Sequence, residues 1–208
     1  MKPGTKIEVI PKIYPNCEAI LMAPGPSLTT EVVERVRKVK HRYVIIGVGD
    51  VYKVVDFMDE HYACDARWWQ VHGDKVNKLR PKLSSWCHDD EGKKWGAKQI
   101  NGKGNPGLST DPRIIHYGSN SGYQAINLAY LWGCTKMILV GYNMMKVDGK
   151  SHFFKDREEG LQINSPYGSF ASKFTSIQAN IKDTIVNCTY PTGLKAFRMS
   201  TLDEELDG

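Results

Sequence analysis

Apolar residues along the chain gather in short continuous runs that alternate with stretches of helical spacing. Such runs occupy residues 18–23, 43–48, 61–64, 136–140 and 184–187, with a length and composition typical of buried strands. Between them, residues 31–40 and 125–131 place apolar side chains at intervals of three or four, which predicts helices. Strands and helices that alternate in this way predict an α/β fold with a mostly parallel sheet.

The clearest unit in the sequence is residues 118–143. It consists of a loop of small residues, a helix that stops at Gly133, and an apolar strand. A loop that enters a helix presents unpaired backbone N–H groups and the positive end of the helix dipole, so it can hold an anion. The candidate binding residues here are Ser119, Asn120, Ser121, Gly122, Gly141, Tyr142 and Asn143. The alternative interpretation is a well-capped core helix and strand that bind nothing.

Three more turns follow predicted strands directly. Their candidate residues are Gly25, Pro26 and Ser27 in the first turn, Gly49 and Asp50 in the second, and Asp65 in the third. Gly25 lets backbone approach a ligand, and Ser27 or Thr29 can cap a helix or donate a hydrogen bond. Ligands of parallel sheets bind beyond the carboxyl ends of the strands, so all these turns are expected at one edge. Any tight turn between a strand and a helix can use the same residues, so the first turn alone is weak evidence.

Two adjacent tryptophans, Trp68 and Trp69, stand at a predicted helix start just after Asp65. Adjacent helical positions point about 100° apart, so one ring can enter the core while the other faces a cleft. Core packing of both rings is the other interpretation, and the sequence leaves the two open.

Two segments lack this periodicity. Residues 86–113 are rich in glycine and lysine and are interpreted as an excursion from a single domain that covers residues 1–208. Residues 144–165 form a long charged loop directly after a strand and are predicted to be a lid. His152 lies in that loop and is the histidine best placed to act as a general base, although a lone loop histidine is more often ordinary surface.

Composition narrows the class of protein only slightly. The chain has 208 residues, 41% of them hydrophobic and 25% charged, which is typical of a globular protein. Its formal net charge of +5 suits anionic ligands such as nucleotides but does not single them out. Five scattered cysteines without C-x-x-C spacing indicate free thiols in a reducing compartment. We therefore expect a cytoplasmic protein with no membrane segment.

The motifs of several large enzyme classes do not occur in the sequence. It contains no Asp-x-Asp pair, no His-x-x-x-His, no P-loop pattern and no G-x-S-x-G. A metal-dependent sugar transferase or a P-loop enzyme is therefore disfavoured, and no metal site is predicted.

The motifs taken together resemble known families. Residues 20–28, Ile-Leu-Met-Ala-Pro-Gly-Pro-Ser-Leu, are similar to the G-x-G-P-S-L turn of bacterial sialyltransferases that use CMP-sialic acid, and of archaeal hydroxymethylpterin pyrophosphokinase-like proteins. Residues 119–143 resemble the helix and Gly-x-Asp strand end of the same families. Residues 62–69, 149–153 and 186–189 resemble uncharacterised proteins of tailed phages.

This resemblance implies a Rossmann-like single domain with helices on both faces of its sheet. It implies a nucleotide-sugar donor, CMP-linked or linked to another nucleoside phosphate, bound by Gly25, Pro26, Ser27, Ser121 and Gly122. It also implies a metal-independent transfer with His152 as the base, in the cytoplasm of an infected bacterium if the chain is phage-encoded. The sequence departs from the pattern at Gly49, where asparagine is expected, at Asn143, where aspartate is expected, and in lacking the tyrosines that assist the leaving phosphate.

Three functions follow from these observations. The first is a glycosyltransferase of phage type that moves a sugar to a hydroxyl, on a glycan or a modified DNA base. The second is a pyrophosphokinase that uses ATP and magnesium. The third is a non-catalytic accessory protein that binds nucleotides or nucleic acid, in which Gly49 and Asn143 mark a lost activity. The acceptor and the oligomeric state are not specified by the sequence.

Overall fold

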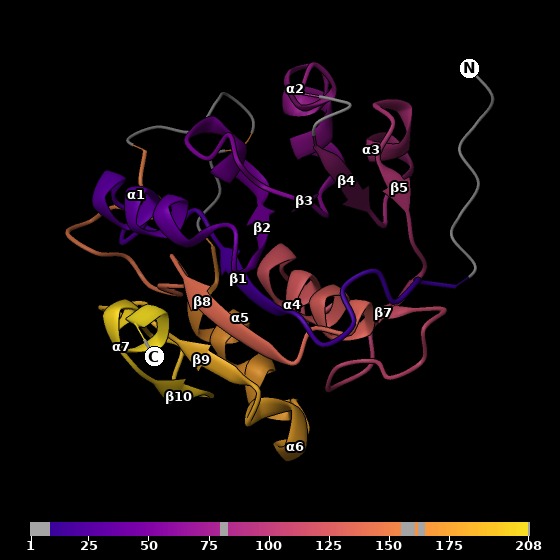
Figure 1. Cartoon of the computed structure of the whole chain (residues 1–208). Helices are drawn as coiled ribbons and strands as arrows, with labels where there is room; N and C mark the ends of the chain where they lie inside the picture. The colour runs from indigo at the N-terminus through magenta and orange to yellow at the C-terminus, as the bar shows by residue number, and fades with distance from the viewer. Residues whose placement is uncertain (1–8, 80–82, 155–160, 162–164, 208) are drawn as a thin grey trace.

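The computed structural model describes residues 9–79, 83–154, 161 and 165–207 (Figure 1). Eight strands, all paired in parallel, form one sheet in the order β10-β9-β8-β1-β2-β3-β4-β5. The strands are β1 (Glu18–Met22), β2 (Val44–Val48), β3 (Glu60–Tyr62), β4 (Ser84–Cys87), β5 (Lys98–Gln99), β8 (Lys136–Val140), β9 (Ile185–Asn187) and β10 (Arg198–Met199). The short β6 (Gly102–Lys103) and β7 (Ile115–His116) pair with each other outside it.

The order of the strands places β1 at a reversal of the chain. From β1 the chain moves outward through β2, β3, β4 and β5, and then returns to the other side of β1 with β8. This is the doubly wound, Rossmann-like arrangement, and it confirms the predicted fold class. In such sheets the crevice beside the reversal is where ligands bind.

Helices cover both faces of the sheet because successive strand residues point to opposite sides. In β1, Ala19 and Leu21 join the core under α4, while Ile20 and Met22 join the core under α1 (Figure 1). The α-helices are α1 (Thr30–Val39), α2 (Ala66–Asn77), α3 (Asp90–Lys94), α4 (Ser121–Trp132), α5 (Tyr167–Lys173), α6 (Ala179–Lys182) and α7 (Leu202–Asp207), and the 3₁₀ helices are η1 (Gly49–Lys53) and η2 (Phe174–Ser176).

The helix α4 is the most deeply buried of these elements, and its ends lie where the sequence places them. Asn120 is the N-cap, and its Oδ1 accepts the backbone N–H of Tyr123 at 2.8 Å. Gly133 is the C-cap with φ of 97°, a left-handed conformation that favours glycine. Local signals therefore fix the length of this helix, and tertiary packing fixes its position.

Part of the stretch predicted as an excursion belongs to the sheet. Trp86 and Cys87, at the start of residues 86–113, lie in β4 with exposures of 1% and 0%. Gly92 in α3 packs so closely that an added Cβ would lie 2.7 Å from the Cys87 sulfur. The many glycines and lysines of this region made it look like surface and obscured the buried residues of β4. The part of the chain that leaves the sheet begins only after β5.

Most of the second half of the predicted lid cannot be compared with the structure, since residues 155–160 and 162–164 lie outside the described residues. Residues 144–154 are described, and they include His152. Within the part of the chain that the structure describes, no helix is long and apolar enough to cross a membrane.

Candidate functional site

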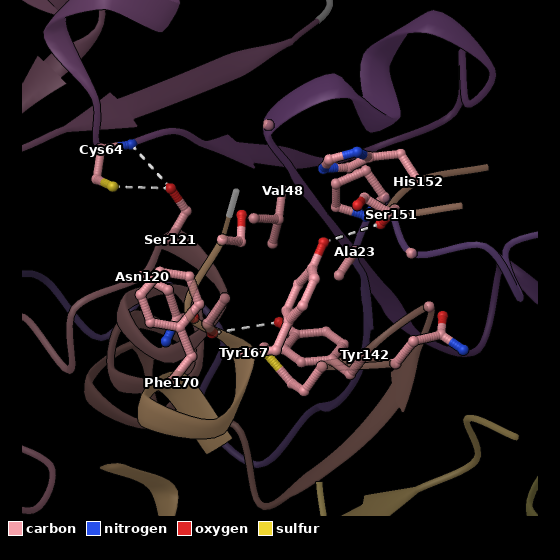
Figure 2. A pocket seen from close by; sticks show the side chains of 18 of the residues that line it. Ala23, Val48, Cys64, Asn120, Ser121, Tyr142, Ser151, His152, Tyr167 and Phe170 are labelled. Atoms are coloured by element: carbon pink, nitrogen blue, oxygen red, sulfur yellow. Dashed lines mark hydrogen bonds between the residues drawn. The ribbon is translucent and has the colours of Figure 1, made fainter. Parts of the chain in front are cut away.

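A cavity of about 260 Å³ lies at the carboxyl ends of β1, β2, β3 and β8, beside the reversal of strand order. Its walls come from the turns after these strands, from the first turn of α4, and from two further segments. Those segments are residues 151–152 and the region of residues 165–170 around the start of α5 (Figure 2). The cavity therefore occupies the position at which parallel sheets bind ligands.

Most of the residues predicted from the sequence meet in this cavity. Those that line it are Gly25, Gly49, Asp65, Ser119, Asn120, Ser121, Gly122, Gly141, Tyr142, Asn143 and His152. Pro26, Ser27 and Asp50 lie outside its lining. Whether the lining residues bind a ligand stays a prediction, but the sheet brings together turns that are up to 120 positions apart in the chain.

The turn after β1 is tied to the turn after β8 through Asn143, which is 2% exposed. The N–H and O–H of Ser27 both donate to Asn143 Oδ1, at 3.1 and 2.8 Å, and Asn143 Nδ2 donates to the Pro191 carbonyl at 2.6 Å. A Cβ added to Gly25 would lie 2.2 Å from the Gly141 oxygen. Gly25 is therefore required because the turn after β8 packs directly against it. The Ser27 hydroxyl bonds to Asn143 and helps to hold the same two turns together.

The N-terminus of α4 is held by its own polar side chains. Asn120 caps the helix and also donates to the Gly118 carbonyl at 3.0 Å. The Ser121 hydroxyl accepts the Cys64 N–H at 3.1 Å and donates to Cys64 Sγ at 2.9 Å, which joins α4 to the end of β3 (Figure 2). Ser121 and Gly122 also line the cavity, and their backbone N–H groups, in the first turn of α4, have no acceptor within the helix.

Cys64 and Asp65 form the wall after β3. Burial, followed by the nearby Asp65 carboxylate, raises the pKa of the Cys64 thiol well above its ordinary value, so this cysteine stays protonated at neutral pH. Asp65 is the N-cap of α2, but its side chain makes no capping hydrogen bond. Its exposed carboxylate instead lies at the cavity wall, where it can accept hydrogen bonds from hydroxyl groups.

The two tryptophans of α2 are both buried in one core cluster, with Trp68 4% exposed, which agrees with the core-packing interpretation for both rings. Trp69 is fully buried and donates its indole N–H to the Ala63 carbonyl at 3.0 Å. Trp68 lines the cavity, and its indole N–H points to Asp50 Oδ2 at 3.4 Å. Asp50 was predicted as a ligand-binding residue, but its carboxylate is fully buried behind this wall.

The wall opposite α4 is formed by the segment that carries His152. The Phe153 N–H donates to the Pro24 carbonyl at 3.1 Å, which attaches the segment to the turn after β1. His152 stacks on Phe154 with ring centroids 5.1 Å apart and an interplanar angle of 21°. The Tyr167 hydroxyl donates to the Ser151 carbonyl at 3.3 Å (Figure 2). The imidazole therefore lies at the cavity, on a backbone held at two points.

Several lining residues were not foreseen as site residues. Tyr167 and Phe170 approach the cavity from α5, far along the chain from the other walls. Tyr167 also supplies a cavity tyrosine in a chain whose sequence showed no clear match for one. The available signal was weak, because a Tyr or Phe beside a charged loop is equally typical of a helix packed on the core.

The described residues contain no group of three or more His, Cys, Asp and Glu side chains that could hold a metal ion. The cavity instead combines backbone donors at α4, a carboxylate at Asp65 and an imidazole at His152. This set can bind an anion at one wall, accept hydroxyl groups at a second, and exchange a proton at a third.

Comparison with known proteins adds a structural neighbour. No protein-family model and no curated protein matches the chain. The structure is similar to that of MAf glycosyltransferase from Magnetospirillum magneticum AMB-1, with a TM-score of 0.64 and 10% sequence identity. The match covers 95% of this chain and 36% of the other, so the chain spans about a third of that protein's length. This likeness shows a shared fold, while the resemblance to sialyltransferases and pyrophosphokinase-like proteins stays a prediction.

Proposed function

We propose that the protein is a metal-independent glycosyltransferase that transfers a sugar from a nucleotide donor to a hydroxyl acceptor. The observation that carries this proposal is the placement of His152 and the first turn of α4 at one cavity beside the strand reversal. The fold shared with a glycosyltransferase agrees with it. The donor base, the sugar and the acceptor are left open.

In the proposed reaction the donor phosphate lies at the N-terminus of α4. The backbone N–H groups of Ser121 and Gly122 and the helix dipole stabilise the charge that grows on this phosphate as the bond from the sugar carbon to the phosphate oxygen breaks. The acceptor oxygen forms the new bond to that carbon and gives its proton to His152. The Asp65 carboxylate accepts hydrogen bonds from hydroxyls of the donor, and the Trp68 ring offers an apolar surface beside them.

Ligand binding is tested by thermal shift with CMP, CDP, UDP, GDP, ADP and ATP, each with and without magnesium. A nucleotide at 100 times its dissociation constant adds about 2.7 kcal/mol to the free energy of unfolding. Stabilisation by one nucleotide without magnesium is the expected result and names the donor class. A response confined to magnesium and ATP would favour the pyrophosphokinase, and no response to any nucleotide would contradict both enzymes and favour the accessory protein.

Catalysis is tested with His152→Ala and the donor identified by that screen. The variant should keep the thermal shift, because the imidazole faces the acceptor, and should lose about a hundredfold or more in turnover measured as nucleotide release. His41→Ala is the matched control, since His41 is an exposed histidine between α1 and β2, at the other edge of the sheet. Full turnover in His152→Ala would refute the assignment of the base.

A further inference from the structure

A buried carboxylate lies behind the cavity and contacts groups that lead to two of its walls. Asp50, in η1, is fully buried. Its Oδ2 faces the indole N–H of Trp68 at 3.4 Å, and its Oδ1 lies 2.9 Å from Lys53 Nζ and 3.4 Å from His72 Nε2. Because Asp50 does not itself line the cavity, its effect on the cavity must pass through these neighbours.

The contact with Lys53 leads to the histidine of the site. Lys53 Nζ lies 4.5 Å from the centroid of the Phe154 ring, within the range of a cation–π contact, and the lysine side chain is only 24% exposed. Phe154 in turn stacks on His152. Four side chains from two distant segments therefore form a continuous series of contacts, from the buried carboxylate of Asp50 to the imidazole of His152 at the cavity.

Each contact in this series restricts the next one. A lysine side chain has a flexible stem, and the short ion pair with Asp50 within one turn of η1 selects its position. The ammonium group then favours the Phe154 ring that presents its face. The backbone bond from Phe153 to Pro24 fixes the main chain of the segment but leaves the side-chain angles of its neighbours free. The stack on Phe154 acts directly on the orientation of the His152 ring.

We propose that Asp50 and Lys53 are positioning residues that hold the His152 imidazole at the cavity through Phe154. The same carboxylate orients Trp68 on the adjacent wall. The part of this proposal that concerns turnover rests on the proposed glycosyltransferase function, whereas the part that concerns the orientation of His152 does not.

The orientation is measured by NMR of the His152 imidazole C–H resonance, assigned by its loss in His152→Ala. Stacking on Phe154 shifts this resonance upfield, so Phe154→Leu should move it downfield. Lys53→Met removes the charge and keeps most of the stem, and should move it in the same direction, while Lys53→Arg should keep the wild-type value. Lys78→Met is the control, because it removes a lysine paired with Asp74 on the exposed surface of α2. An unchanged resonance in Lys53→Met would overturn the proposal.

Turnover gives an independent readout with the donor from the thermal-shift screen. Lys53→Met should lower kcat by about fivefold, the factor that corresponds to a cation–π contact of about 1 kcal/mol, with the donor KM within about twofold. Lys53→Arg should restore kcat. If kcat is unchanged in Lys53→Met while His152→Ala loses turnover, the claim that Lys53 positions His152 for turnover is overturned and the proposed glycosyltransferase function stands. Full turnover in His152→Ala would instead contradict the proposed function and leave the NMR result to decide the orientation.

Discussion

The hydrogen bonds of the Asn143 amide predict how the substitution Asn143→Asp changes the stability of the protein. In Asn143→Asp the side chain keeps its shape, but the Nδ2 group that donates to the Pro191 carbonyl at 2.6 Å becomes an oxygen. The Ser27 N–H and O–H can still donate to the other oxygen. The substitution therefore keeps two hydrogen bonds and replaces the third by a contact between two acceptors in a site that is 2% exposed.

The magnitude follows from the groups involved. A buried carbonyl that loses its donor costs about 1–3 kcal/mol, and burial of a carboxylate adds to that cost. The two donors of Ser27 offset part of it, because hydrogen bonds to a charged acceptor are stronger than neutral ones. We expect a net loss of about 3 kcal/mol in the free energy of unfolding, which for a chain of this length lowers Tm by about 10 °C.

The sign of the pH dependence separates this mechanism from general damage. A protonated carboxyl at position 143 satisfies all three hydrogen bonds, so its pKa in the folded state must lie above the unfolded value of about 3.9. The loss of stability should therefore grow as pH rises through the folded pKa and should nearly vanish below about pH 4.

The assay is urea denaturation at pH 4 and pH 7.5, with Asn105→Asp as the control for a new charge on an exposed loop residue. Stability relative to wild type is compared at each pH, so that the titration of other groups cancels. A loss below about 1 kcal/mol at pH 7.5, or the same loss at both pH values, would refute the reasoning about the Pro191 carbonyl.

Two further predictions concern the turns and the buried histidine. Gly25→Ala should cost about 3 kcal/mol or more in chemical denaturation, since its Cβ would lie 2.2 Å from the Gly141 oxygen, whereas Gly104→Ala, with nothing within 4 Å, should be nearly neutral. Burial lowers the pKa of His61 from 6.5 to about 4, although its Nε2 contacts the Gly49 carbonyl at 2.9 Å. The unfolded chain therefore binds the proton first, and stability should fall by up to about 3 kcal/mol as pH drops from 6.5 to 4. The His61→Gln variant should lack this part of the loss.

Local features of the fold were predictable from the sequence because their causes lie within a few residues. Asn120 and Gly133 bound α4 through bonds to its own backbone, and the apolar run at residues 137–140 is continuous because β8 is covered on both faces. The meeting of strand-end turns at one edge was equally predictable, since it follows from parallel pairing alone.

Features that depend on distant partners were not predictable. Asp50 looked like a ligand-binding residue because an acidic residue after a strand is equally consistent with binding and with packing. Its partners Trp68 and His72 lie on α2, and only the fold brings that helix behind the turn. The burial of Trp86 was missed for a related reason. Polar residues follow it in the sequence and lie at or near the surface, whereas the Trp86 ring lies in the core.

The same distinction changes how the cavity residues should be interpreted. Small polar side chains after parallel strands have structural work of their own: Ser27 and Asn143 hold one turn against the next, and Asn120 caps its own helix, each through two or more hydrogen bonds. Because those bonds already use them, their replacement should lower stability before it changes affinity. Under the proposed function, recognition rests on the backbone N–H groups of α4 and on the side chains of Asp65 and His152, which line the cavity. For this cavity, small polar residues at strand ends therefore mark the edge of the sheet where the turns meet, and they do not by themselves indicate which side chains would bind a ligand.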